Sequence, residues 1–130
     1  MLHRNSLLIV TAVLEAATGL ALLVLPSLLL KLLLGVDQAA LEAIFIARVA
    51  GAALLAIGVT CYLARNDKQS PAQTGVITGA LIYNVAIALL LVYGGIVLAM
   101  TGIALWPVVV LHTALALWCV ACLRLSQSMK

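Results

Sequence analysis

Four polar side chains interrupt stretches of the sequence that are otherwise apolar: Glu15, Arg48, Asn84 and His112. Glutamate and arginine can form an ion pair, asparagine can hydrogen-bond to either, and histidine can donate or accept a proton. An arginine near the centre of a membrane costs about 2.5–3.5 kcal/mol to insert, so Arg48 requires a partner. We therefore predict a buried polar network of these four residues, in which Glu15 pairs with Arg48.

The role of this network has two interpretations. Charged groups inside membranes often line paths for substrates or protons, but in a small bundle they can equally fix how the helices pack. By the same reasoning, His112 is either a hydrogen-bonded core residue or a functional one, such as a proton relay, a haem or metal ligand, or a contact to a quinone. One histidine does not make a metal site, and we predict no metal centre.

Two cysteines, Cys119 and Cys122, have the C-x-x-C spacing of thiol redox centres, and Cys61 is expected at a similar depth. Four-helix membrane thiol oxidoreductases of the vitamin K epoxide reductase type also place such a pair on their fourth helix. This chain lacks their second, loop-borne pair. Cysteine is also an ordinary small apolar residue, so we favour a packing role and keep a redox role as the alternative.

The composition of the chain indicates the kind of structure that positions these residues. Hydrophobic residues make up 66% of the 130 residues and charged residues 8%, against about 25% charged in soluble proteins. Four apolar stretches are long enough to cross a membrane, and they predict helices over residues 6–25, 38–64, 71–99 and 105–124. We therefore predict an all-α bundle of four transmembrane helices in a single domain, residues 1–130. The seven basic residues are scattered, which argues against nucleic-acid binding.

Local signals divide the chain further. Pro26 predicts a break after the first span, because proline disrupts a continuing helix, and residues 27–34 then form a short helix at the membrane interface. Asp37 is a candidate N-cap for the second span. Ser70 followed by Pro71 is typical of a helix start and predicts the beginning of the third span.

The basic residues also predict the orientation of the bundle. With four spans, five of them fall on the side of the two termini and one on the opposite side. Those on the side of the termini are Arg4, Arg65, Lys68, Arg124 and Lys130, and the opposite side has Lys31. Because basic residues accumulate on the cytoplasmic side, we predict that both termini are cytoplasmic.

Several of these segments resemble a known group. The run Leu14–Leu20, the segment Ala47–Gly51, Tyr83-Asn84, and Trp106-Pro107 together with His112 are similar to poorly characterised bacterial four-helix membrane proteins, which are DoxX-like at superfamily level. Named members of that superfamily include a small subunit of a thiosulfate:quinone oxidoreductase. The resemblance implies a four-helix fold and a place in the bacterial inner membrane.

Two function hypotheses follow. Nearly the whole chain is predicted to lie in the bilayer, and the sequence has no nucleophile triad or phosphate loop. We favour a non-enzymatic inner-membrane subunit or accessory protein that packs against other membrane subunits or copies of itself and holds a quinone-like or lipid-like ligand. The alternative is a redox or proton-coupled carrier that uses Glu15, Arg48 and His112, with Cys119 and Cys122 as its thiol pair.

Overall fold

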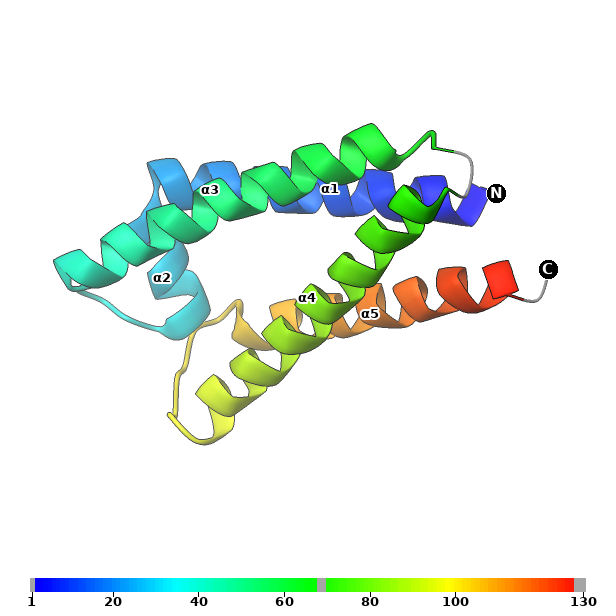
Figure 1. Cartoon of the computed structure of the whole chain (residues 1–130). Coiled ribbons are helices and arrows are strands. Elements are labelled where there is room, and N and C mark those ends of the chain that lie inside the picture. Colours follow the sequence, from blue (N-terminus) through cyan, green and yellow to red (C-terminus); the bar gives the residue numbers. More distant parts are fainter. Residues whose placement is uncertain (1, 68–69, 128–130) are drawn as a thin grey trace.

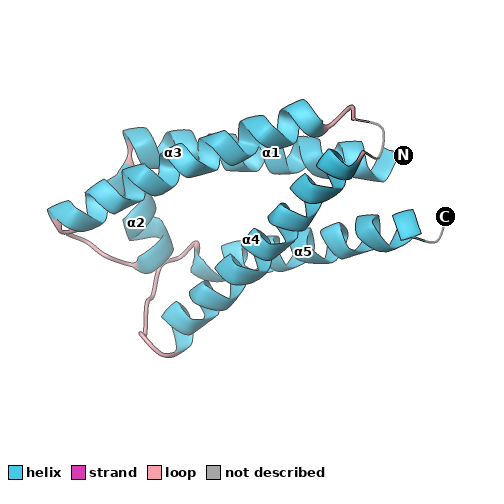
Figure 2. Cartoon of the chain, in the orientation of Figure 1, coloured by secondary structure: helices cyan, strands magenta, loops and turns pink. Residues whose placement is uncertain are grey.

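The computed structural model describes residues 2–67 and 70–127. Throughout this part of the chain the secondary structure is helical, with four long helices and one short one (Figure 2). Each long helix contains a segment of 20 to 26 residues that is apolar enough to cross a membrane. The protein is therefore an all-α, multi-pass membrane protein with four spans, as predicted. Lys68 and Lys130, which the sequence places on the side of the termini, lie outside the described residues.

The predicted break at Pro26 is confirmed. Helix α1 (Leu2–Val24) is separated from the short helix α2 (Pro26–Leu34) by Leu25, whose backbone leaves the helical conformation. Proline fits the first position of α2, where its missing N–H would have no partner within the helix. Gly35 ends α2 in the left-handed conformation, with φ of 76°. This conformation favours glycine because a side chain would be strained there.

Helix α3 (Leu41–Ala64) begins three residues later than the sequence predicts. The expectation that Asp37 caps this helix is wrong, since Ala40 is the N-cap residue. Asp37 instead pairs with Lys31 of α2, with 2.9 Å between Nζ and Oδ1. The carboxylate is therefore engaged with a neighbouring cation rather than with the first turn of α3.

The predicted start of α4 (Pro71–Ile96) is confirmed. The Ser70 hydroxyl accepts a hydrogen bond from the backbone N–H of Gln73 at 3.0 Å, as an N-cap residue does. The helix ends three residues before the predicted end at residue 99. Helix α5 (Leu105–Gln127) begins where predicted and extends three residues beyond the predicted end.

The four spans are arranged as two pairs of helices. Helix α1 packs along α3, and α4 packs along α5, while contacts between the two pairs are much fewer (Figure 1). The described ends of α1 and α5 lie at one end of the bundle with the α3–α4 connection, and α2 lies at the other end. We call these the terminal end and the α2 end. The two pairs separate toward the α2 end.

Glycines allow the backbones of α1 and α3 to come very close. A Cβ atom placed on Gly51 would lie 2.7 Å from the carbonyl oxygen of Gly19, and one on Gly58 would lie 2.9 Å from a carbonyl oxygen of α1. Both distances are shorter than real Cβ contacts, so these positions require glycine. Gly75 and Gly79 have the same spacing as close-packing glycines, but no atom lies within 4 Å of a Cβ built on either.

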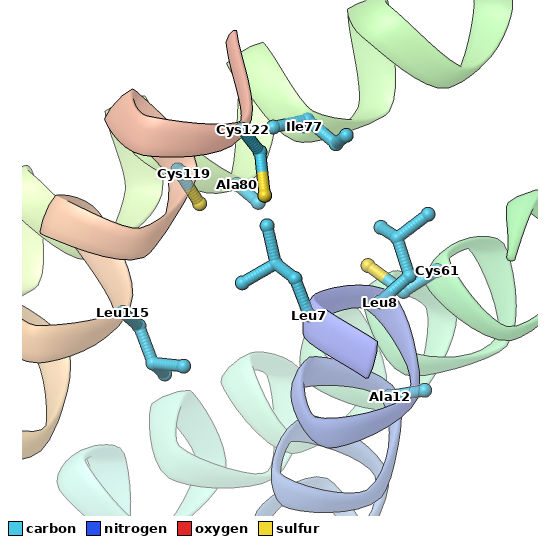
Figure 3. Packing of buried hydrophobic residues seen from close by; sticks show 9 residues of the cluster. All are labelled: Leu7, Leu8, Ala12, Cys61, Ile77, Ala80, Leu115, Cys119 and Cys122. Carbon is cyan, nitrogen blue, oxygen red and sulfur yellow. The ribbon is translucent and has the colours of Figure 1, made fainter. Parts of the chain in front are cut away.

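The main hydrophobic core lies near the terminal end and joins the two pairs (Figure 3). All four long helices contribute side chains that are almost completely buried. They are Leu7, Leu8 and Ala12 of α1, Cys61 of α3, Ile77 and Ala80 of α4, and Leu115, Cys119 and Cys122 of α5.

A buried arginine completes the contacts at the terminal end. Arg4 is 5% exposed, and its guanidinium donates to the Gln73 side chain, to the Thr74 hydroxyl and to the backbone carbonyl of Cys122, at 3.3 to 3.4 Å. Gln73 in turn donates to the carbonyl of Ala64, the last residue of α3, at 3.0 Å. Arg4 and Gln73 thus join α1, α4, α5 and the C-terminal end of α3 through hydrogen bonds.

At the α2 end, the connection between α4 and α5 packs against α2. The backbone N–H of Ala104 donates to the carbonyl of Leu32 at 2.9 Å. A Cβ on Gly102 would lie 2.2 Å from the carbonyl group of Leu33, so only glycine permits this contact. Helix α2 therefore bridges the space between the pairs, linked covalently to one pair and docked on the other.

Candidate ligand cavity between the helix pairs

A cavity of about 370 Å³ lies between the two helix pairs. Its walls are mainly leucine and other aliphatic side chains: Leu14 and Leu22 of α1, Leu29, Leu32 and Leu33 of α2, Ile87, Leu90 and Leu91 of α4, and Val108, Leu111 and Leu115 of α5. Four polar residues also line it: Glu15, Thr18, Tyr83 and His112. An apolar pocket of this size with a few converging polar groups is the usual form of a small-molecule site.

Asn84 and His112 form the first polar contact of this site. The Nδ1 atom of His112 lies 2.7 Å from Oδ1 of Asn84, and the Asn84 amide nitrogen donates to the carbonyl of Ala80 at 2.7 Å. Asn84 is completely buried and His112 is 8% exposed. The contact was predicted only as part of a larger network, and the structure brings these two members of it together across α4 and α5.

Glu15 takes part in the second contact, with a residue that the sequence analysis did not select. The hydroxyl of Tyr83 on α4 lies beside the carboxyl group of Glu15. The Tyr83 ring also meets the His112 ring edge to face, with centroids 5.7 Å apart and planes at 76°. The signal in the sequence was an aromatic hydroxyl directly before Asn84. Through Tyr83, three of the four predicted network residues lie in one group.

The structure does not bring Arg48 into this group. Arg48 lies on the exposed surface of α3 and lines a groove formed by α3 residues alone, from Leu41 to Arg48. Its neighbour Ala47 is buried, and Gly51, one turn after Ala47, faces α1. One helical residue corresponds to a rotation of about 100°, which turns Arg48 away from Glu15. Among the described residues no ion pair joins Glu15 to Arg48, so the predicted pairing is replaced by the contact with Tyr83.

The three cysteines lie outside the cavity. Cys61, Cys119 and Cys122 are free thiols with exposed fractions of 1%, 0% and 2%, and they pack among the aliphatic side chains of the core (Figure 3). This arrangement is the one that a packing role requires. The proposed redox role of the C-x-x-C pair stays a prediction.

Within the described residues no group of three or more histidine, cysteine or acidic side chains could hold a metal ion. Comparisons with protein-family models, with curated proteins and with solved structures find no match to this chain. The chemistry of the cavity must therefore be argued from its own residues.

Those residues favour binding and proton exchange over bond-breaking chemistry. The walls are apolar, and the ionisable groups are one carboxyl, one phenol and one imidazole, each already held by a neighbouring side chain. Such groups can orient the polar end of an apolar molecule, and the carboxyl and imidazole can also accept a proton from it. The cavity thus has the composition expected for an amphiphilic ligand.

Proposed function

We propose that this protein is a small membrane subunit or accessory protein that binds a lipid-like or quinone-like molecule in the cavity between its helix pairs. The observation that carries this proposal is the cavity itself, an apolar space at membrane depth in which two nine-tenths buried polar side chains, Glu15 and His112, are present. Polar groups inside a membrane are costly to keep and are usually retained for function.

The shape of the bundle supports the same proposal. Helix α2 and the connection that docks on it cover the cavity at one end, and the core of leucines and cysteines lies at the other. An acyl or isoprenoid chain would contact the aliphatic walls, while its polar end would reach Glu15, Tyr83 and His112. This arrangement requires no soluble domain.

The setting of the protein is part of the proposal. The resemblance to DoxX-like proteins suggests a bacterial inner-membrane location and assembly with other membrane subunits or with further copies of the chain. Arg4, Arg65 and Arg124 lie toward the terminal end and Lys31 toward the α2 end, which supports cytoplasmic termini. In a variant without native cysteines, a cysteine at Asn66 should resist labelling from outside the cell and one at Val36 should react, and the reverse pattern would reject this orientation.

A proton-coupled carrier is the second candidate, and the contact between Glu15 and Tyr83 favours it because it places two proton-exchanging groups beside His112. The original form of this hypothesis also used Arg48, which lies outside the cavity. Of the residues in that hypothesis, a carrier would therefore use Glu15 and His112, together with Tyr83. It predicts proton uptake by vesicles that is driven by a ligand gradient, whereas a binding subunit predicts none.

Native mass spectrometry after purification in a mild detergent tests the main proposal. We expect a bound amphiphile in the wild-type protein, together with any stable partner subunits. Ala50→Phe should remove the amphiphile, because Ala50 lines the cavity and the larger side chain would fill it. Gly79→Phe, at a position with open space around it, is the matched control and should retain the amphiphile. Equal amounts bound to both variants would place the molecule elsewhere.

A further inference from the structure

We infer that the polar end of the cavity's ligand is a hydrogen-bond donor, a hydroxyl or N–H group, and that the cavity selects against analogues whose polar end can only accept. A phenol or hydroquinone head would satisfy this requirement, and an ether or an oxidised quinone would not. This inference rests on the proposed function, because it assigns the ligand chemistry of the same cavity.

The first step concerns His112. The amide nitrogen of Asn84 is committed to the carbonyl of Ala80, so the oxygen of the amide faces the imidazole. An amide oxygen can only accept, and Nδ1 of His112 must therefore carry the proton. In the neutral ring the other nitrogen, Nε2, is then an acceptor. No partner for Nε2 is found in the described part of the chain, and His112 lines the cavity.

The second step concerns Glu15. The Tyr83 hydroxyl lies beside the carboxyl group of Glu15, and in the ionised form of this group both oxygens can only accept. Arg48, the cation that could have supplied further donors, is on the exposed surface of α3. Glu15 thus keeps unused acceptor capacity while being 3% exposed.

The other polar groups near the cavity do not change this excess of hydrogen-bond acceptors over donors. Thr18 is the one other polar residue in the described lining, and its single hydroxyl can donate or accept. The Asn84 amide nitrogen donates to the Ala80 carbonyl of its own helix, and Asn84 is not among the residues that line the cavity. A ligand without a donor would leave the Nε2 of His112 unpaired in an apolar space, and would leave Glu15 with Tyr83 alone beside it. Sites that contain such groups reject the donorless analogue strongly.

A matched pair of neutral probes tests the inference. 4-Nonylphenol and 4-nonylanisole have the same ring and chain, and they differ in the hydroxyl that the second carries as a methyl ether. We expect the wild-type protein in maltoside micelles to bind the phenol at least tenfold more tightly, measured by isothermal titration calorimetry. The double variant His112→Phe/Asn84→Leu should reduce this ratio markedly, because it removes Nε2 without leaving the amide unpaired.

Control variants separate the possible failures. Thr113→Val lies next to His112, but its hydroxyl is exposed and bonds to its own helix, so the ratio should be unchanged. If both probes bind equally and Ala50→Phe removes both, the donor requirement is overturned while the binding function stands. If neither probe binds the wild-type protein above the level of Ala50→Phe, both the inference and the proposed function fail. The wild-type ratio decides the matter even if the double variant does not fold.

Discussion

The two ends of the bundle treat their buried polar groups in opposite ways. At the terminal end, Arg4 has three hydrogen-bond partners on α4 and α5, and Gln73 links this group to α3. Toward the α2 end, Glu15 and His112 are as deeply buried, but each has a single side-chain partner and borders a cavity. The first set of polar groups joins helices to one another. The other retains bonding capacity that a ligand can fill.

In a molecule made almost wholly of apolar helices, this difference distinguishes the buried polar groups that stabilise the fold from those that are available to bind a ligand. Buried polar groups with complete sets of partners are expected to contribute to stability, since removing one leaves the others unpaired. Groups with incomplete sets cost stability and are expected to contribute to binding. The predictions below test whether the comparison holds, and they proceed from the largest expected effect to the smallest.

The largest effect on stability is expected within the α1/α3 pair, which extends from one end of the bundle to the other. Gly51→Leu would place a side chain against the backbone of α1, because even a Cβ would lie 2.7 Å from the Gly19 oxygen. We expect a loss of about 3 kcal/mol or more in the free energy of unfolding, measured in mixed micelles with increasing dodecyl sulfate. Gly79→Leu, with no neighbour within 4 Å, should be neutral or slightly stabilising. Similar losses in both would show that the close approach is not what holds the pair.

Arg4→Met tests the terminal end. The substitution removes the donor to two buried acceptors and to the half-buried Thr74 hydroxyl, and a loss of about 2–3 kcal/mol in unfolding free energy is expected. Arg124→Met, at an exposed position in the last turns of α5, removes the same charge and should change stability little. Ligand binding in the cavity should survive Arg4→Met in the fraction that remains folded. An equal effect of both substitutions would remove the contrast between the two ends.

A double-mutant cycle tests the cavity. Glu15→Gln and Tyr83→Phe should show a coupling of about 0.6 kcal/mol, the size typical of hydrogen bonds between membrane helices. Glu15→Gln combined with Arg48→Met should be additive, because the structure places these two side chains on different surfaces. Thermal stability in detergent of the single and double variants measures both couplings. Coupling to Arg48 but not to Tyr83 would restore the ion pair that the sequence suggested.

The smallest effect concerns the exposed pair of Lys31 and Asp37 at the α2 end. The Lys31 ammonium lowers the pKa of Asp37 below its ordinary 3.8, and Asp37 raises the pKa of Lys31 above its ordinary 10.5. The pair's contribution is therefore present between these values. It is lost as the pH falls through the lowered pKa of Asp37, or rises through the raised pKa of Lys31. Asp37→Asn should leave thermal stability at pH 7 nearly unchanged. A large loss would show that this end is held by charge.

The sequence predicts the spans well because hydropathy and proline report on single helices. Pro26, Ser70 and Pro71 mark breaks and starts through local backbone chemistry, and each lies where expected. Asp37 shows the limit of such local signals, since its carboxylate can cap a helix or pair with a lysine and only the fold decides.

The candidate site could be predicted only in part. Glu15, Asn84 and His112 stand out as polar residues in apolar runs, and the structure brings them together. Helix α3 is apolar on all sides, so hydropathy does not indicate which face meets α1, and the outward direction of Arg48 could not be derived. Tyr83 and Arg4 were missed as contacts because their partners are distant in the chain.

The docking of the α4–α5 connection on α2 has a consequence for biogenesis. Ribosomes deliver α1, α2 and α3 to the bilayer before the third and fourth spans exist, so the first pair can assemble on its own glycines. Two contacts form only after residue 104 has been synthesised. They are the hydrogen bond from Ala104 to Leu32 and the close contact between Gly102 and Leu33. Until then the polar face that Glu15 contributes to the cavity is open to the surrounding lipid, and the fourth span closes it last.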